Sequence, residues 1–147
     1  MITIKNTQRT INIPATKVKA IVARVLKKLE YTDFDIGIWF TTDKTIRRYN
    51  KQYRAINRPT DILSFPYHTE IKPKTKIIAR TSDDKNLGDL IISAEYIARA
   101  ASSFNIPLAD HLNIILVHGI CHLLGYDHET EQDYQQMAQL EKKLLKS

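Results

Sequence analysis

Three of the five histidines in this 147-residue chain fall within one short segment, at a spacing that could bind a metal ion. His118 and His122 are four residues apart, so on a helix both side chains project from the same face. Gly125 would let the chain leave that helix through a left-handed turn, which could bring His128 back as a third ligand. Three protein ligands and a fourth position open to water are typical of a catalytic zinc site. The segment therefore predicts one zinc ion per chain, although three histidines also accept other divalent ions.

The residues between these histidines limit the chemistry. The same spacing occurs in metalloproteases with the motif H-E-x-x-H-x-x-G-x-x-H, in which the glutamate is the general base. Here that position is Gly119, which can carry no proton, so the predicted metal ligands are present without the proteolytic base. Asp127 could orient a histidine through a hydrogen bond to its ring. Cys121 points to a different helix face and is expected to pack in the core, while His68 and His111 are expected to be ordinary core or surface residues.

Four basic residues recur along one line of a predicted helix: Arg47, Lys51, Arg54 and Arg58. A guanidinium can bind a phosphate through two hydrogen bonds and stabilise the charge that develops during its cleavage. Tyr49 and Tyr53 lie between these residues and offer rings on which bases could stack. The pattern thus predicts a substrate-binding surface, and its alternative is a solvated helix face. Pro59 makes the helix uncertain beyond Arg54, so Arg58 could belong to a loop.

The distribution of charge suggests a polyanionic partner. The net charge is +6, but residues 1–80 carry 17 Lys and Arg against 6 Asp and Glu, whereas residues 81–147 carry 5 against 10. The two parts therefore have net charges of +11 and −5. A basic part joined to a metal-binding part favours nucleic acid as the substrate, and a merely soluble basic surface is the alternative.

Composition predicts a single domain, residues 1–147, that folds in the cytoplasm. Hydrophobic residues make up 43% of the chain, and no apolar run is long enough for a membrane span. The N-terminal residues lack the pattern of a signal peptide, and a single cysteine suits a reducing compartment. We therefore expect a soluble cytoplasmic protein without a membrane partner.

Hydrophobic periodicity predicts the elements that position these residues. Strands are expected at residues 2–4, 10–13, 34–41, 62–65 and 87–92, with a loop or edge hairpin at 67–86. Five helices are expected. The first covers residues 16–29, the second runs from an Asp43 cap to about residue 53, and the third begins at residue 93. The fourth covers residues 108–124, and the fifth begins at a Thr130–Asp133 capping box. Phe104 is placed on a buried stripe with Ile97, and Tyr134 on one with Met137. The order of these strands and helices along the chain predicts an α+β fold, with a small mixed sheet covered by helices and a central metal-bearing helix.

Three segments of the chain resemble the YbeY family, metal-dependent endoribonucleases of ribosomal RNA maturation, and they occur in the same order as in that family. The family motif H-G-x-x-H-L-x-G-Y-D-H is matched in full by residues 118–128. The pattern N-x-x-Y-R, followed by P-T-D-(hydrophobic)-L-S-F-P, is matched by Asn50, Tyr53, Arg54 and residues 59–66. The pattern L-G-D-(apolar)₃-S is matched by residues 87–93. The length also agrees, so the resemblance covers essentially the whole chain. The chain departs from the family at Ile56-Asn57, where a Lys-Asp pair is frequent, and at Cys121, where leucine is usual.

The resemblance implies that His118, His122 and His128 bind zinc and that activity depends most on His118 and Arg54. It also implies a core like that of zinc metalloproteases. The expected function is single-strand-specific cleavage of RNA in small-subunit rRNA maturation and ribosome quality control, with the ribosome or its assembly factors as partners. The metal would act as a Lewis acid, with either its water or the RNA 2′-OH as the nucleophile. Two alternatives are a zinc metallopeptidase-like hydrolase and a non-catalytic RNA-binding assembly factor in which zinc is structural.

Overall fold

The computed structural model describes residues 1–146, which form one four-stranded mixed sheet with helices on both faces. The strands are β1 (Ile2–Asn6), β2 (Asp35–Thr41), β3 (Ile62–Pro66) and β4 (Asn86–Ser93), and their order in the sheet is β1-β2-β4-β3. β1, β2 and β4 are parallel, and β3 pairs antiparallel with β4 at one edge. The predicted α+β fold is confirmed.

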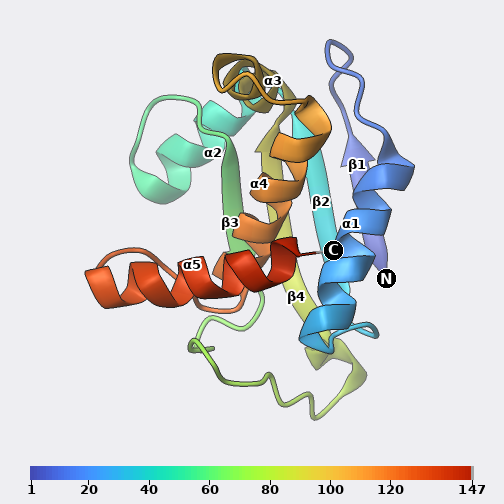
Figure 1. The fold of residues 1–147 in the computed structure, drawn as a ribbon, viewed down its shortest axis with the longest axis vertical. Coiled ribbons are helices and arrows are strands. Elements are labelled where there is room, and N and C mark those ends of the chain that lie inside the picture. The colour runs from blue at the N-terminus through green and yellow to red at the C-terminus, as the bar shows by residue number, and fades with distance from the viewer. Residues whose placement is uncertain (147) are drawn as a thin grey trace.

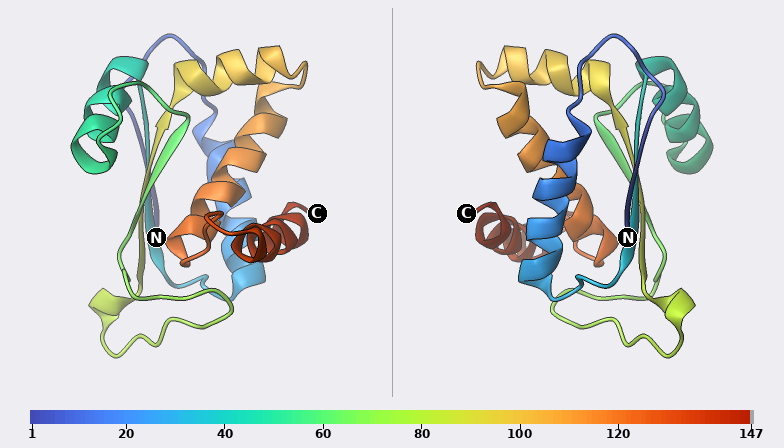
Figure 2. Two further views of the ribbon diagram at one scale, coloured as in Figure 1. Left: turned by 90° about the vertical axis from the view of Figure 1, so that its left-hand side faces the viewer. Right: turned by 90° about the vertical axis from the view of Figure 1, so that its right-hand side faces the viewer.

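Five α-helices pack around this sheet. They are α1 (Ala15–Leu29), α2 (Asp43–Arg54), α3 (Ala94–Ser103), α4 (Leu108–Leu123) and α5 (Glu131–Leu145), and the 3₁₀ turn η1 spans Ser82–Asp84. α1, α4 and α5 lie on one side of the sheet, whereas α2 lies on the other side and covers only one end of it (Figures 1 and 2). α4 therefore runs between the sheet and the outer helices, in the central position that its apolar sequence predicts.

Gly119 allows α4 to pack closely on the sheet. A Cβ atom at this position would lie 2.6 Å from Ile62 Cδ1 and 2.9 Å from Leu90 Cδ2, closer than carbon atoms normally approach. Ser64 of β3 also donates a hydrogen bond to the Gly119 carbonyl oxygen at 3.4 Å. Gly119, which stands where the metalloproteases have their glutamate, thus faces strands β3 and β4.

One expected strand, at residues 10–13, and one expected helix cap, at Asp43, are wrong. Residues 10–13 form an irregular segment, because the Gln8 side chain bonds both the N–H and the carbonyl of Ile11, at 2.9 and 2.8 Å, in place of a strand partner. The N-cap of α2 is Thr42, whose hydroxyl accepts from the Thr45 N–H. Asp43 instead accepts from the Ser93 hydroxyl at 2.6 Å, which ties the start of α2 to the end of β4.

Two aromatic residues expected on buried helix stripes are exposed. α3 ends at Ser103, and Phe104 is 65% exposed because the chain turns there toward α4. Tyr134 is 59% exposed, whereas Met137 of the same helix is buried. Figure 1 gives the reason, since the first turn of α5 extends beyond α4.

The remaining boundaries follow the expectations. Residues 67–85 form a loop that contains η1, and this loop connects the antiparallel pair β3 and β4. The Thr130 hydroxyl caps α5 by accepting from the Asp133 N–H at 3.1 Å. Within residues 1–146, no single helix is long and apolar enough to cross a membrane, and α3 and α4 reach that length only as a pair bent by 118°.

Candidate metal centre

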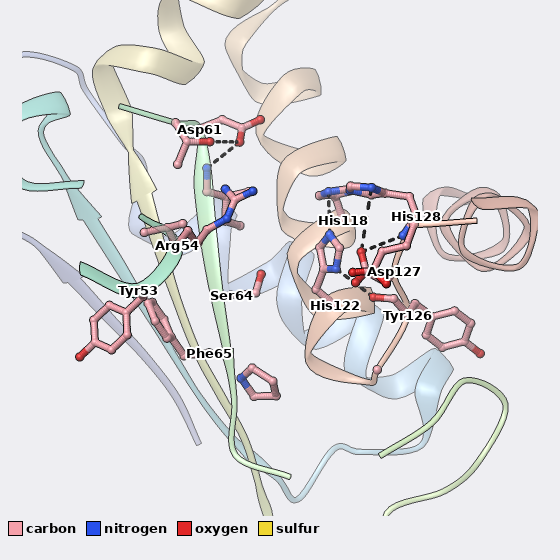
Figure 3. Close-up of a pocket in the computed structure, with 16 residues that line it drawn as sticks. Tyr53, Arg54, Asp61, Ser64, Phe65, His118, His122, Tyr126, Asp127 and His128 are labelled. Carbon is pink, nitrogen blue, oxygen red and sulfur yellow. Dashed lines mark hydrogen bonds and ion pairs between the residues drawn. The ribbon is translucent and has the colours of Figure 1, made fainter. Parts of the chain in front are cut away.

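The three histidines of the motif meet at the C-terminal end of α4. His118 and His122 are one turn apart on the helix, and their Nε2 atoms lie 3.1 Å apart. His128 comes from the loop that follows, and one ring nitrogen of each histidine lies within 4.8 Å of the others (Figure 3). The sequence predicted this convergence from spacing alone.

A left-handed turn at Gly125 brings His128 back to the helix. Gly125 has a φ of +89°, as the sequence predicted, and its amide donates to the His122 carbonyl oxygen at 3.0 Å. A Cβ atom at Gly125 would overlap the backbone carbonyl of Ile71 in the loop between β3 and β4. Glycine is therefore required here both for its conformation and for the close approach of a second segment.

Two of the rings are oriented by acceptors behind them. His118 Nδ1 donates to the Glu141 carboxylate at 2.9 Å, and His122 Nδ1 donates to the Tyr126 carbonyl oxygen at 2.9 Å. Because neither a carboxylate nor a carbonyl can donate, each Nδ1 must carry the proton. Each Nε2 lone pair is then free to bind a metal, the arrangement found at histidine metal sites in proteins.

The geometry of these atoms fits a zinc-sized ion. Two nitrogen ligands at about 2.0–2.1 Å from one tetrahedral zinc lie roughly 3.3 Å apart, close to the 3.1 Å between the Nε2 atoms of His118 and His122. Burial lowers the pKa of His122, and the neighbouring His118 lowers it further. His122 is therefore neutral at pH 7, the form that a ligand requires. The three residues can hold a metal ion, and other divalent ions suit the same donors.

Asp127 lies beside His128 but contacts its backbone more closely than its ring. Its carboxylate accepts from the backbone N–H of His128 at 2.8 Å and lies 4.0 Å from His128 Nδ1, beyond the length of a good hydrogen bond. It thus stabilises the loop that carries His128.

Glu141 is the partner of His118 that the sequence analysis missed. It belongs to α5, four residues after the buried Met137 and three before the buried Leu144, and its side chain is 24% exposed. An acidic residue on the inward face of an amphipathic helix was the signal that could have found it, since a buried carboxylate needs a partner.

The histidines line a cavity of about 930 Å³ that also contains Arg54. Its other wall is formed by residues 60–66, which include the edge strand β3. Arg54 is the last residue of α2, and its guanidinium projects past β3 toward His118 (Figure 3). The guanidinium donates to the Asn50 side-chain oxygen at 3.4 Å. Asn50 is buried, and its amide nitrogen donates to the Arg58 carbonyl oxygen at 2.9 Å, which fixes the turn after the helix.

The other three predicted phosphate-binding residues do not line this cavity. Arg47 donates to the Asn57 side chain at 2.9 Å, and α2 ends at Arg54, so Arg58 lies in the following loop. Lys51 is an exposed residue of α2 outside the lining. Of the four basic residues that the sequence placed along one line, Arg54 alone lines the cavity.

The cysteine and the other two histidines do not line this cavity. Cys121 is fully buried in the core, where burial raises the pKa of its thiol to about 12. His68 contacts the Asp84 carbonyl oxygen through Nε2 at 2.7 Å, and His111 is 6% exposed. The expectation of core or surface positions for these three residues is confirmed.

Fold and site define a small α+β domain whose central helix and following loop gather three histidines opposite an arginine. The profile of the family described as Endoribonuclease YbeY matches residues 3–147, and the chain belongs to this family. Similar curated proteins carry the same description. One from Homo sapiens is 39% identical over 142 residues, covering 97% of this chain and 84% of the relative. One from Persephonella marina is 37% identical, covering 88% of this chain and 80% of the relative.

A solved structure supports the fold. The solution structure of a protein from Thermotoga maritima has a TM-score of 0.59 to this chain and is 22% identical to it. The alignment covers 98% of this chain and 89% of the other.

Proposed function

We propose that this protein is a zinc-dependent endoribonuclease that cleaves single-stranded RNA during the maturation of small-subunit ribosomal RNA. The observation that carries the proposal is the shared cavity, in which Arg54 faces the three histidines of a metal site. Membership of a family of endoribonucleases supports RNA as the substrate. Ribosomal subunits or their assembly factors are the proposed partners.

The histidines would hold the zinc ion, with Glu141 and the Tyr126 carbonyl orienting two of their rings. When bound, the ion supplies a Lewis acid for a phosphoryl oxygen and lowers the pKa of a coordinated water molecule. The hydrogen bond from His118 Nδ1 to Glu141 leaves Nε2 as the ligand atom of that ring.

Arg54 would bind the phosphate that is cleaved. Its guanidinium carries a permanent positive charge and can direct two N–H groups at phosphate oxygens. Because it lies on the cavity wall opposite the histidines, it can stabilise charge that develops on the phosphate in the transition state. Asn50 orients it through the hydrogen bond to the guanidinium.

Gly119 argues against the metallopeptidase alternative. A glutamate there would have to displace Ile62 and Leu90, whose methyl groups already fill the space in front of the α-carbon. The packing around residue 119 therefore leaves no room for the glutamate of the peptidases.

The test combines metal analysis with RNA cleavage. Zinc content would be measured by elemental mass spectrometry, followed by cleavage of a short unstructured RNA by wild type, His118→Ala and Arg54→Ala. Arg48→Ala is the matched control, because Arg48 is exposed on the same helix and does not line the cavity. Stoichiometric metal is expected in wild type, with a rate loss of about 100- to 1000-fold for Arg54→Ala and wild-type cleavage by the control.

Circular dichroism of each variant would show that the fold is kept. Equal RNA breakdown by all preparations would indicate a contaminating nuclease and refute the proposal. Casein cleavage abolished by a chelator would favour the peptidase. The ends of the products distinguish the nucleophile, because attack by the 2′-OH first leaves a 2′,3′-cyclic phosphate.

A further inference from the structure

The sheet face on the α2 side contains a hollow that the proposed cleavage site does not use. It has a volume of about 370 Å³, within the range of small-ligand pockets, roughly 300–1,000 Å³. Its walls include Trp39, Tyr49, Tyr53 and Phe65, and Tyr53 is 59% exposed. Figure 2 shows that α2 covers only one end of this face.

The pairing of the strands explains why this place is hollow. Thr3, Gly37, Asp89 and Phe65 are lateral neighbours across the four strands. Gly37 leaves a gap in this row, and the exposed Asp89 carboxylate leans into the place where a Cβ of residue 37 would stand. On the same face, Lys5 Nζ lies 4.6 Å from the centre of the Trp39 ring. The hollow thus combines aromatic walls with one carboxylate acceptor and one ammonium donor.

We propose that this hollow binds a base of the RNA strand that is cleaved at the histidine site. The inference rests on the proposed endoribonuclease function and adds a subsite to it. Aromatic rings stack on any base, whereas a carboxylate accepts hydrogen bonds only. Asp89 therefore favours bases with an exocyclic amino group, which are adenine, cytosine and guanine. Uracil has carbonyl oxygens in the equivalent positions and offers the carboxylate only its ring N3–H, so it binds more weakly.

The position of the hollow favours RNA over a protein partner. Tyr53 and Phe65 line both the hollow and the cavity of the histidines, so the two spaces meet at the edge strand β3. Figure 3 shows both rings on the side of β3 away from the histidines, while Arg54, next to Tyr53, points toward them. A single strand whose phosphate contacts Arg54 can continue over β3 and place a neighbouring base in the hollow.

Trp39 provides a direct probe, since it is the only tryptophan in the chain. Metal-loaded protein would be titrated with short 2′-O-methyl oligonucleotides of adenine, cytosine or uracil, and each would be checked on a gel for intactness. We expect Trp39 fluorescence to change on binding, and adenine and cytosine oligonucleotides to bind at least fivefold more tightly than uracil.

Two variants test the roles of the side chains. Tyr53→Leu should weaken binding of every oligonucleotide by about 5- to 150-fold, the range for loss of one base–aromatic stack. Tyr134→Leu is the matched control, because Tyr134 is also 59% exposed but lies on α5, and its affinity should not change. Asp89→Asn should abolish the preference over uracil, because an amide offers a donor as well as an acceptor.

The outcomes separate this inference from the function on which it rests. If wild type cleaves RNA but Tyr53→Leu and Asp89→Asn bind all three oligonucleotides as wild type does, the subsite is refuted and the nuclease stands. Loss of binding to ribosomal subunits by these variants, with unchanged RNA affinity, would also refute it and make the face a protein-docking surface. If wild type neither binds nor cleaves RNA, both proposals fail.

Discussion

The hydrogen bond between Glu141 and His118 predicts a specific effect on metal affinity. In Glu141→Gln the side chain keeps its length and an acceptor oxygen but loses its charge. A hydrogen bond to a charged group contributes about 1.5–3 kcal/mol, whereas a neutral one contributes about 0.5–1.5 kcal/mol. The difference, about 1–1.5 kcal/mol, corresponds to a loss in affinity of roughly 5- to 13-fold.

Because both side chains are partly exposed, we expect the loss of metal affinity to be small compared with other residues that hydrogen-bond to a metal ligand. The two side chains are 29% and 24% exposed, so solvent screens part of the interaction between His118 and Glu141. Removing a hydrogen-bonding partner of a metal ligand typically costs 10- to 100-fold in affinity. We therefore expect about a tenfold loss for Glu141→Gln and a larger one for Glu141→Ala.

The assay is competition for zinc against a chromogenic chelator. Glu131→Gln provides the control, because Glu131 lies on the same helix, is exposed, and accepts a hydrogen bond from the exposed Gln135 side chain at 3.3 Å. Thermal unfolding of the metal-free proteins would show whether either variant loses the fold. An unchanged zinc affinity in Glu141→Gln, or an equal loss in Glu131→Gln, would refute the reasoning.

Three further predictions concern the surroundings of the site. Gly125→Ala should destabilise the metal-free protein by about 1–3 kcal/mol in urea unfolding, because a φ of +89° is strained for alanine and the methyl group would overlap Ile71; unchanged stability would contradict this account of the turn. Cys121 should not react with a disulfide reagent at pH 8 until guanidinium unfolds the chain, because burial raises the pKa of its thiol to about 12. The pKa of His122 is lowered from its usual 6.5 in the folded state, so below about pH 6.5 the unfolded chain takes up a proton that the folded chain does not. Metal-free protein should therefore be less stable at pH 5.5 than at pH 7.5, and His122→Asn should reduce that difference in urea titrations.

The sequence predicted those features that depend on neighbouring residues. The spacing of His118, His122 and His128 was sufficient because a helix and one glycine turn determine their convergence. Hydrophobic periodicity, together with capping residues and a following proline, was sufficient to place the five helices approximately. Both are local patterns that the tertiary structure does not override here.

The incorrect predictions concern residues whose structure is determined by contacts that the local sequence pattern does not reveal. Residues 10–13 alternate like a strand, but the Gln8 side chain satisfies the backbone of Ile11. Tyr134 has the spacing of a buried residue, but the first turn of α5 has no layer to cover it. Glu141 reaches His118 across 23 residues of sequence, so its place on the inward face of α5 could indicate that it needs a partner but not which residue that partner is.

The bond between Glu141 and His118 joins the last helix of the chain to the metal centre, which makes their stabilities interdependent. A metal that binds more tightly when α5 is docked must, by reciprocity, hold α5 in place more firmly. At a free metal concentration a thousand times the dissociation constant, this linkage could add up to about 4 kcal/mol to the folded state. Metal supply would then govern how often the C-terminal helix detaches and exposes the core beneath it, and so how long the protein survives proteolysis in the cell.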